Sequence, residues 1–513
     1  MAWAPAFIAA LARPAATVRL SARRIVQTWG PGSGISSATS TPTGGGVAGI
    51  GSGVPLALSS QTVSVPSWTT SRGSLRIGLG SQTAGEWAAQ GMPRGALVEL
   101  RATVTGSPVS QTIYRGQVRD LAGIGPQSVL SSWDLLAAVL TRTYWFAGLD
   151  SGALFYHCTP DSIKTRTLAM AWTPGDSTLA CNTTTDFGRQ TGTEGAVLIT
   201  PSSGADPFLV TFTGQTGSTV LGVSDAHGWG PASSVAGIGS TVQEVAWMVG
   251  HPLEVARRIL VSTGAGTNGP WDVYPAAWGY GVPEAFLDLV GFSTWTALTD
   301  PATGTHRVRI VSTVDQPAGG QWLEGVLARY GMWLTMWQGQ ITGRACLEDT
   351  APAPPIVLHL DGSRILRGNP QRSTYHSGSA LEYARTVTRY GTVSPTDVAS
   401  TLTTPETVPA QAEFVTDYGD ELYQNQAAIA ARLNARIGAW VEAVPHAVDL
   451  VCTLEAAQLA PGDWVTVRHP GLWTPSRGGD NPLRAMVGDL SVDWSAGAVT
   501  LRLYLIPTPG GVV

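Results

Sequence analysis

The stretch that decides the fold reads Leu459-Ala-Pro-Gly-Asp-Trp-Val-Thr-Val467. Pro461 presets φ at the second position of a turn, and Gly462 admits the positive φ of the third position. The pattern therefore predicts a tight structural turn at Pro461, Gly462 and Asp463. The alternation that follows predicts a strand over 464–467. We expect Gly462 to take a positive φ between two paired strands.

The segments around this turn follow a regular order. Apolar residues at helical spacing predict a helix before it, and Pro445 closes that segment. A strand comes next, and the chain closes on a strand in which apolar residues alternate with polar ones. The apolar residues of these elements are Leu422, Ile429, Leu433, Ile437 and Trp440 in the helix, Val448, Leu450, Cys452 and Leu454 in the first strand, and Val499, Leu501, Leu503 and Leu505 in the last.

Earlier parts of the chain give further local predictions. Residues 97–104 and 112–118 alternate on either side of Gly106-Ser-Pro108, which predicts a hairpin. Ser132 is placed to cap a helix with Leu135, Leu136, Val139 and Leu140 on its buried face. Pro252 opens another helix. A helical face over 322–330 ends at Gly331, and a hairpin follows around Gln338-Gly339.

The order of helix, strand, L-x-x-GD-x-V-x-V turn and final strand resembles the C-terminal barrel of bacteriophage tail hub proteins (baseplate hub or tail tip hub). The run 262–275 and the helix and hairpin over 322–344 resemble segments of the same family. Arg385-Thr-Val-Thr-Arg-Tyr-Gly391 is similar to its N-x-V-x-V-x-G strand, with Arg385 in place of Asn and Arg389 in place of the second Val. The resemblance covers roughly 245–513, and 1–145 loosely.

Composition indicates a mainly β protein with minor α. Of 513 residues, 61 are Gly and 34 are Pro, which favours many short strands joined by turns. The length suggests several units. With the resemblance, we expect tube-like β-barrel modules at 1–145 and 351–513, an inserted β-rich unit at 146–235 and an α+β unit at 236–350. The 19 Trp suit wide sheet and interface packing.

Charge argues against a protein built to grip nucleic acid. The formal net charge is −5, and Lys164 is the only lysine. A nucleic-acid clamp would present a basic face, whereas a conduit for DNA should avoid binding it. We therefore predict that any channel is lined by acidic and neutral polar residues, with most arginines paired or turned to protein interfaces.

No residue pattern predicts a cofactor, a metal or an enzyme. Cys158, Cys181, Cys346 and Cys452 form no C-x-x-C pair, and His157 with Cys158 fits no zinc spacing. The match to G-x-G-x-x-G at 264–269 follows a helix and precedes Pro270, so it predicts a turn and not a nucleotide site. No positive charge precedes the apolar residues 1–11, and no run reaches membrane-spanning length, so neither secretion nor stable membrane insertion is expected.

The resemblance implies a structural, non-enzymatic role. It implies a homotrimer whose paired barrels form a pseudo-hexameric ring around DNA, which passes without specific binding. The implied partners are the tail tube protein, the distal tail protein, the tape-measure protein and tip or fibre proteins. The implied place is the tail tip or baseplate of the virion, after assembly in the bacterial cytoplasm. Two alternatives stay open: a peripheral tail protein that binds host surface carbohydrate, and a cell-wall hydrolase.

Overall fold

A computed structural model describes residues 3–13, 16, 18–25, 48–49, 56–58, 61–65, 67–70, 74–78, 85, 94–104, 109–122, 129–140, 165–183, 195–205, 208–224, 235–244, 246–261, 282, 284–300, 308–312, 319–347, 355–373, 383–394, 397–403, 412–418, 422, 426–441, 446–469, 482–494 and 496–505. The protein is mainly β, as predicted. The turns at 106–108 and 264–269 and the run 262–275 lie outside the described residues.

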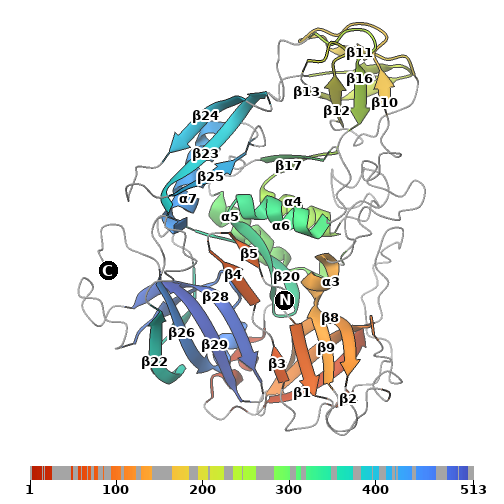
Figure 1. Ribbon diagram of the computed structural model, residues 1–513. Helices are drawn as coiled ribbons and strands as arrows, with labels where there is room; N and C mark the ends of the chain where they lie inside the picture. The colour runs from red at the N-terminus through yellow and green to blue at the C-terminus, as the bar shows by residue number, and fades with distance from the viewer. Residues whose placement is uncertain are drawn as a thin grey trace.

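One long path of paired strands joins the two ends of the chain (Figure 1). Its N-terminal half runs through β2 (Ala48–Gly49), β1 (Val18–Ile25), β7 (Leu97–Val104), β8 (Ser110–Ala122), β9 (Val129–Asp134), β6 (Ser74–Gly78) and β3 (Leu56–Leu58). Its C-terminal half continues through β28 (Leu483–Asp493), β29 (Ala498–Leu505), β26 (His446–Thr453) and β22 (Ile365–Ser373). The barrel form of the two halves stays a prediction, since the described pairings run from β2 to β22 without closing.

Further strands attach to β28 and extend the C-terminal half. β27 (Trp464–Val467) pairs antiparallel with β28 and parallel with β21 (Ile356–Leu360). β4 (Gln61–Ser64) also pairs with β28, and β5 (Thr69–Thr70) pairs with β4. The N-terminal part of the chain therefore supplies strands to both halves, which the predicted division at 145 and 351 does not anticipate.

The two halves share one hydrophobic core. Alternate residues of β7 and β29 point into it, including Val98, Leu100, Leu501 and Leu503. Helix α1 (Pro5–Leu11) lies between them, with Phe7 fully buried. Period-2 alternation produces this face, because successive strand residues point to opposite sides. Cys452 lies in the same core, as expected for an inward-facing residue.

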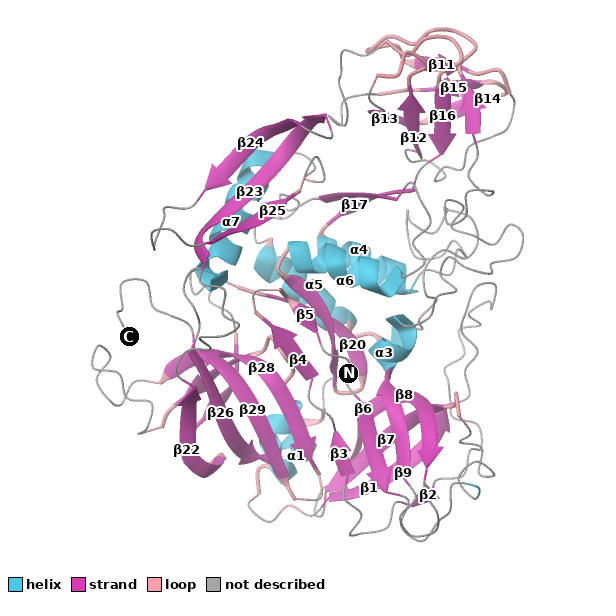
Figure 2. Cartoon of the chain, in the orientation of Figure 1, coloured by secondary structure: helices cyan, strands magenta, loops and turns pink. Residues whose placement is uncertain are grey.

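A layer of helices and a hairpin, here named the middle layer, lies above the two halves in Figures 1 and 2. It contains α3 (Leu135–Leu140), β17 (Ala246–Gly250), α4 (Pro252–Val261), η5 (Glu284–Phe286), α5 (Leu289–Thr299), β18 (Val308–Ser312), α6 (Gly319–Arg329), β19 (Met332–Trp337) and β20 (Gln340–Ala345). The predicted hairpin is confirmed: β19 pairs with β20, and Gln338 and Gly339 both have positive φ between them. None of the described helices is long and apolar enough to cross a membrane.

Helix α3 begins differently from the prediction. Ser132 lies in β9, and its hydroxyl accepts a hydrogen bond from the Tyr114 hydroxyl at 2.9 Å. Asp134 takes the capping role instead, because its Oδ1 accepts from the Ala137 backbone N–H at 2.6 Å. The strand continues two residues further than the sequence pattern indicates, so the cap moves with it.

Two smaller units stand at the other end of the molecule in Figure 1. One holds β23 (Tyr383–Ser394), β24 (Asp397–Thr403), β25 (Ala412–Asp417) and α7 (Gln426–Val441). The other is the inserted β-rich unit, with β10 (Thr165–Thr167), β11 (Thr178–Ala180), β12 (Gly195–Thr200), β13 (Phe208–Phe212), β14 (Gly214–Thr216), β15 (Thr219–Leu221) and β16 (Thr241–Glu244) around its own core. Since β16 pairs with both β10 and β12, this unit reaches Glu244 and not 235.

Candidate functional site at the turn 461–463

The turn connects η6 (Leu454–Gln458) to β27. The Asp463 N–H donates to the Ala460 carbonyl at 3.0 Å, which closes a four-residue turn with Pro461 second and Gly462 third. Gly462 has φ +98°, in the left-handed region that the turn requires. The flanking strands are not paired with each other, contrary to expectation: β26 pairs with β22 and β29, whereas β27 pairs with β21 and β28.

Backbone hydrogen bonds fix the turn against β28. The Gly462 N–H donates to the Val487 carbonyl at 2.7 Å, and the Val487 N–H donates back to the Asp463 carbonyl at 2.9 Å. Pro461 lacks an N–H and needs no acceptor here. All three turn residues are buried, so every polar group of the turn must be satisfied inside the protein.

A second role of Gly462 is close packing against the β19–β20 hairpin. A Cβ atom at this position would lie 2.7 Å from Cζ2 of Trp333 and 3.1 Å from Cβ of Arg344. Real Cβ atoms essentially never approach other atoms as closely as 2.7 Å. Glycine is therefore needed at this position twice, for its φ and for the absence of a side chain.

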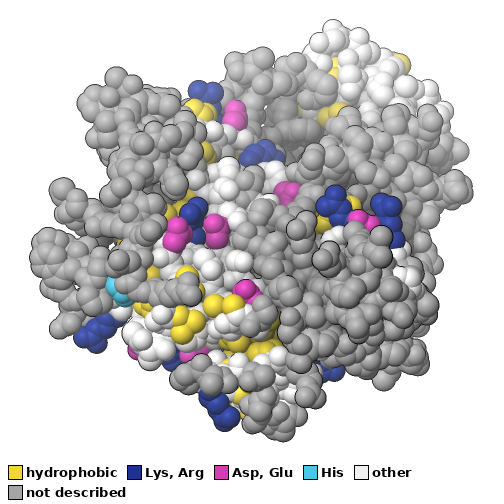
Figure 3. Space-filling model, turned by 60° about the horizontal axis from the view of Figure 1, so that its bottom comes forward, with side chains coloured by type: hydrophobic (Ala, Val, Ile, Leu, Met, Phe, Trp, Pro, Cys, Tyr) yellow, Lys and Arg dark blue, Asp and Glu magenta, His cyan; other side chains and the backbone are white. Residues whose placement is uncertain are grey.

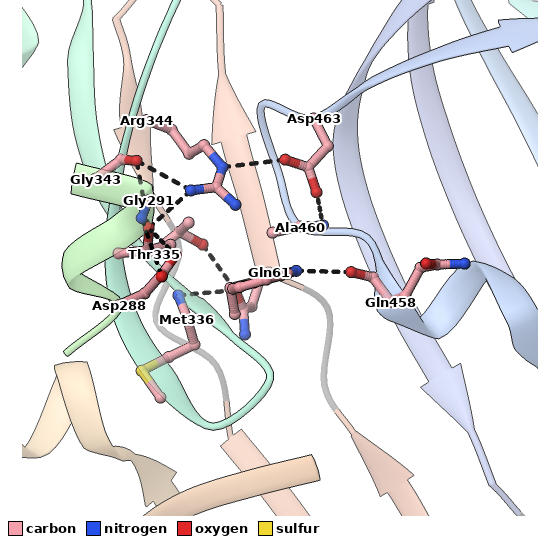
Figure 4. Close-up of polar contacts among 12 residues, drawn as sticks. Gln61, Asp288, Gly291, Thr335, Met336, Gly343, Arg344, Gln458, Ala460 and Asp463 are labelled. Atoms are coloured by element: carbon pink, nitrogen blue, oxygen red, sulfur yellow. Dashed lines mark hydrogen bonds and ion pairs between the residues drawn. The ribbon is translucent and has the colours of Figure 1, made fainter. Parts of the chain in front are cut away.

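Asp463 anchors the turn through both carboxylate oxygens (Figure 4). Its Oδ2 accepts from the Ala460 N–H at 2.8 Å, and its Oδ1 accepts from Nε of Arg344 at 3.1 Å. Both side chains of this ion pair are almost fully buried. Burial raises the pKa of the Asp463 carboxyl, and the nearby Arg344 charge partly offsets that increase.

Arg344 is held on every side. Its Nη1 donates to the Thr342 hydroxyl at 2.7 Å and to the Gly343 carbonyl at 3.1 Å. Its guanidinium carbon lies 5.3 Å from the ring centre of Trp295 and 5.8 Å from that of Trp337, which adds cation–π attraction. A buried charge requires such a complete set of partners, because an uncompensated one would be strongly destabilising.

The network continues into helix α5. The Thr342 hydroxyl donates to Oδ2 of Asp288 at 3.1 Å, and Oδ1 of Asp288 accepts from the Gly291 N–H at 3.0 Å as the helix N-cap. The turn, the hairpin and α5 are thus joined by one chain of hydrogen bonds, from Asp463 through Arg344 and Thr342 to Asp288. Figure 4 shows Asp463, Arg344 and Asp288 along it. This arrangement holds the C-terminal half against the middle layer. It is a structural joint.

Sequence reasoning named the turn but missed its partners. Arg344 lies 119 residues before Asp463, and Asp288 lies further upstream still. One signal was present: Arg344 is the lone charge in the strand Gln340-Ile-Thr-Gly-Arg-Ala345, where every residue is buried. A single arginine in such a strand needs an acidic partner inside the protein. Among the described residues, no group of three or more His, Cys, Asp or Glu is placed to hold a metal ion.

Comparisons with known proteins give weak likenesses only. No family model matches the chain, and no curated protein matches its sequence. Similar solved structures include a tail protein from Neisseria meningitidis (TM-score 0.39, 10% identity, 95% of this chain and 96% of that one) and a prophage tail protein from Listeria monocytogenes (0.39, 7%, 95% and 94%). A 43 kDa prophage tail protein from Shewanella oneidensis gives 0.37 and 9%, over 95% and 98%. At TM-scores below 0.5, these likenesses do not establish a family or a function.

Proposed function

We propose that this protein is a structural hub of a bacteriophage tail tip or baseplate, without enzymatic activity. The observation that carries the proposal is the join between β3 and β28, where Ala57 pairs with Asp493. Through it, sheets from opposite ends of the chain lie edge to edge in one subunit. Three subunits would present six such sheets, which suits a ring on a six-fold tube. The L-x-x-GD-x-V-x-V motif, with its buried turn, supports the same proposal.

In this proposal the chain forms a homotrimer within the virion. It joins the tail tube protein to the tip and binds the distal tail, tape-measure and tip or fibre proteins. A closed cyclic trimer leaves no open contacts for unlimited growth. Electron microscopy of intact tails, viewed along the tail axis, tests this. We expect three copies around an open channel. A ring of six copies, or a peripheral position away from the axis, would contradict the proposal.

The polar face of the C-terminal half suits the lining of a DNA channel. Arg502 on β29 bonds Asp449 on β26 through Nε at 2.9 Å and Nη2 at 3.1 Å, and its Nη1 lies 3.9 Å from Asp489 on β28. One cation is thus held by two carboxylates, and the trio keeps a net negative charge. In Figure 3, the described Arg side chains on the face shown are interspersed with described Asp and Glu side chains. This distribution does not favour a phosphate clamp.

A titration with double-stranded DNA at about 50 mM salt, where charge attraction is little screened, tests the passive channel. We expect no sub-micromolar binding by the wild-type chain. A double variant, Asp449→Asn with Asp489→Asn, should bind more tightly because it frees the Arg502 cation. A matched variant, Asp176→Asn in the inserted unit, should not. Sub-micromolar binding by the wild type would contradict a passive conduit.

The carbohydrate-binding alternative drew on the tryptophan content. Among the described residues, the exposed large apolar side chains are Met, Val, Ile and Leu. Tryptophans such as Trp3, Trp172, Trp333 and Trp464 lie in the cores. Sugar binding needs aromatic faces open to solvent, so these four buried tryptophans are used for packing instead. Among the residues that the structure describes, no contact favours the hydrolase alternative.

A further inference from the structure

Residues 61–65 and 67–70, here named the strap, lie between the C-terminal half and the middle layer. It contains β4 and β5. β4 pairs with β28 through Thr62 and Gln61 only, whereas β29 pairs along nearly the whole of β28. The side-chain oxygen of Gln61 accepts from the Thr335 hydroxyl at 2.8 Å and from the Met336 N–H at 3.3 Å. The strap therefore has few backbone contacts to the sheet and relies on side chains.

Trp68 gives the strap a strained backbone. Its φ is +53°, a left-handed value at which a bulky aromatic residue is an outlier. Its N–H donates to the Ser64 carbonyl at 2.7 Å, so it closes the loop between β4 and β5. Glycine is the usual residue at a left-handed position that ends a short hairpin loop. Such strain persists only when surrounding contacts hold the residue in place.

The contacts that hold Trp68 come from two other elements, β19 and α7. Its ring stacks on Trp333 of β19, with centroids 5.8 Å apart and planes 6° from parallel. It meets Trp440 of α7 edge-on at 6.1 Å, and Trp440 meets Trp464 of β27 at 6.2 Å. The indole N–H groups of Trp68, Trp333 and Trp464 are buried without an acceptor. Stacking stabilises the docked strap, while the strained backbone and the desolvated indole N–H of Trp68 favour release.

We propose that the strap releases and docks as a unit while the sheet behind it stays folded. Release relaxes the Trp68 backbone and gives its indole N–H access to water. It also uncovers the edge of β28 at Asp489 and Leu490 and the ring of Trp333. An unpaired strand edge beside apolar surface is prone to aggregation. The docked strap protects this edge. The inference does not depend on the hub role.

Hydrogen exchange of the full chain tests this. Amides of β4, β5 and Trp68 should show protection factors at least about tenfold lower than those of β29, because they open without global unfolding. Amides of β19 and β20 should keep high protection. Equal protection in the strap and β29 would overturn the proposal. Loss of protection in the β19–β20 hairpin together with the strap would also overturn it, because the opening unit would then be the whole middle layer.

A variant pair sharpens the test. Gln61→Met removes the bonds to Thr335 and Met336 and should lower strap protection about three- to tenfold further, with β29 unchanged. Gln117→Met is the matched control, since Gln117 donates to the Gly95 carbonyl at 3.0 Å in the N-terminal half. It should leave the strap unchanged. If Gln61→Met lowers strap and β29 protection equally, the strap does not move independently.

Discussion

Replacement of Gly462 by alanine separates the two reasons for glycine in the turn. At φ +98°, a non-glycine residue costs about 1–3 kcal/mol in backbone strain. The added Cβ also lies 2.7 Å from Trp333, and forcing an extra methyl into a packed site costs about 1–3 kcal/mol more. Gly462→Ala should therefore lower the free energy of unfolding by about 2–6 kcal/mol. Gly462→Val, with a branched side chain, should cost more than alanine.

Gly497 provides the matched control in the turn between β28 and β29. Its φ is +68°, but a Cβ there would meet nothing within 4 Å. Gly497→Ala should therefore cost only the strain of about 1–3 kcal/mol. Urea unfolding of both variants, followed by circular dichroism, measures the difference. Equal losses would show that the turn does not pack against the hairpin as described. If Gly462→Ala melts like the parent and still assembles, the turn assignment is wrong.

Three other predictions concern buried charge and titration. Asp463→Ala leaves the Arg344 cation buried without its carboxylate, so the free energy of unfolding in urea should fall by about 3–5 kcal/mol. Adding Arg344→Met to this variant should restore part of that loss. No recovery in the double variant would contradict this prediction. Burial lowers the pKa of His251 to about 3. The stabilisation that neutral His251 contributes is therefore fully present above about pH 6.5 and is lost as the pH drops toward 3. The melting temperature of His251→Gln should then change less than that of the wild type between pH 6.5 and 4.5. An equal change of melting temperature with pH in both proteins would show that His251 is not the cause. Burial raises the pKa of Tyr504 to about 12, so stability falls as pH rises from about 10 toward 12. Tyr504→Phe should lose less stability than the wild type between pH 10 and 11. The same loss in both proteins would show that Tyr504 does not cause it.

Several elements could be predicted from the sequence because their signals are local. The Pro461-Gly462 pair encodes its own turn, since proline fixes one φ and glycine permits the next. The alternation of 498–505 encodes which face of β29 is buried. The hairpin around Gln338-Gly339 is encoded in the same way. Each of these depends only on neighbouring residues, so no knowledge of distant segments was required.

Other features were decided only by the tertiary structure. Periodicity tells which face of an element is buried but not what it packs against. The pairing of Arg344 with Asp463, the docking of Trp68 on Trp333 and the join between β3 and β28 all connect segments more than a hundred residues apart. Such contacts form because separate apolar faces are buried together, and the polar groups trapped between them must find partners there. The sequence by itself determined the turn at 461–463. Only the tertiary structure decided that this turn connects the C-terminal half to the hairpin and α5, through Arg344.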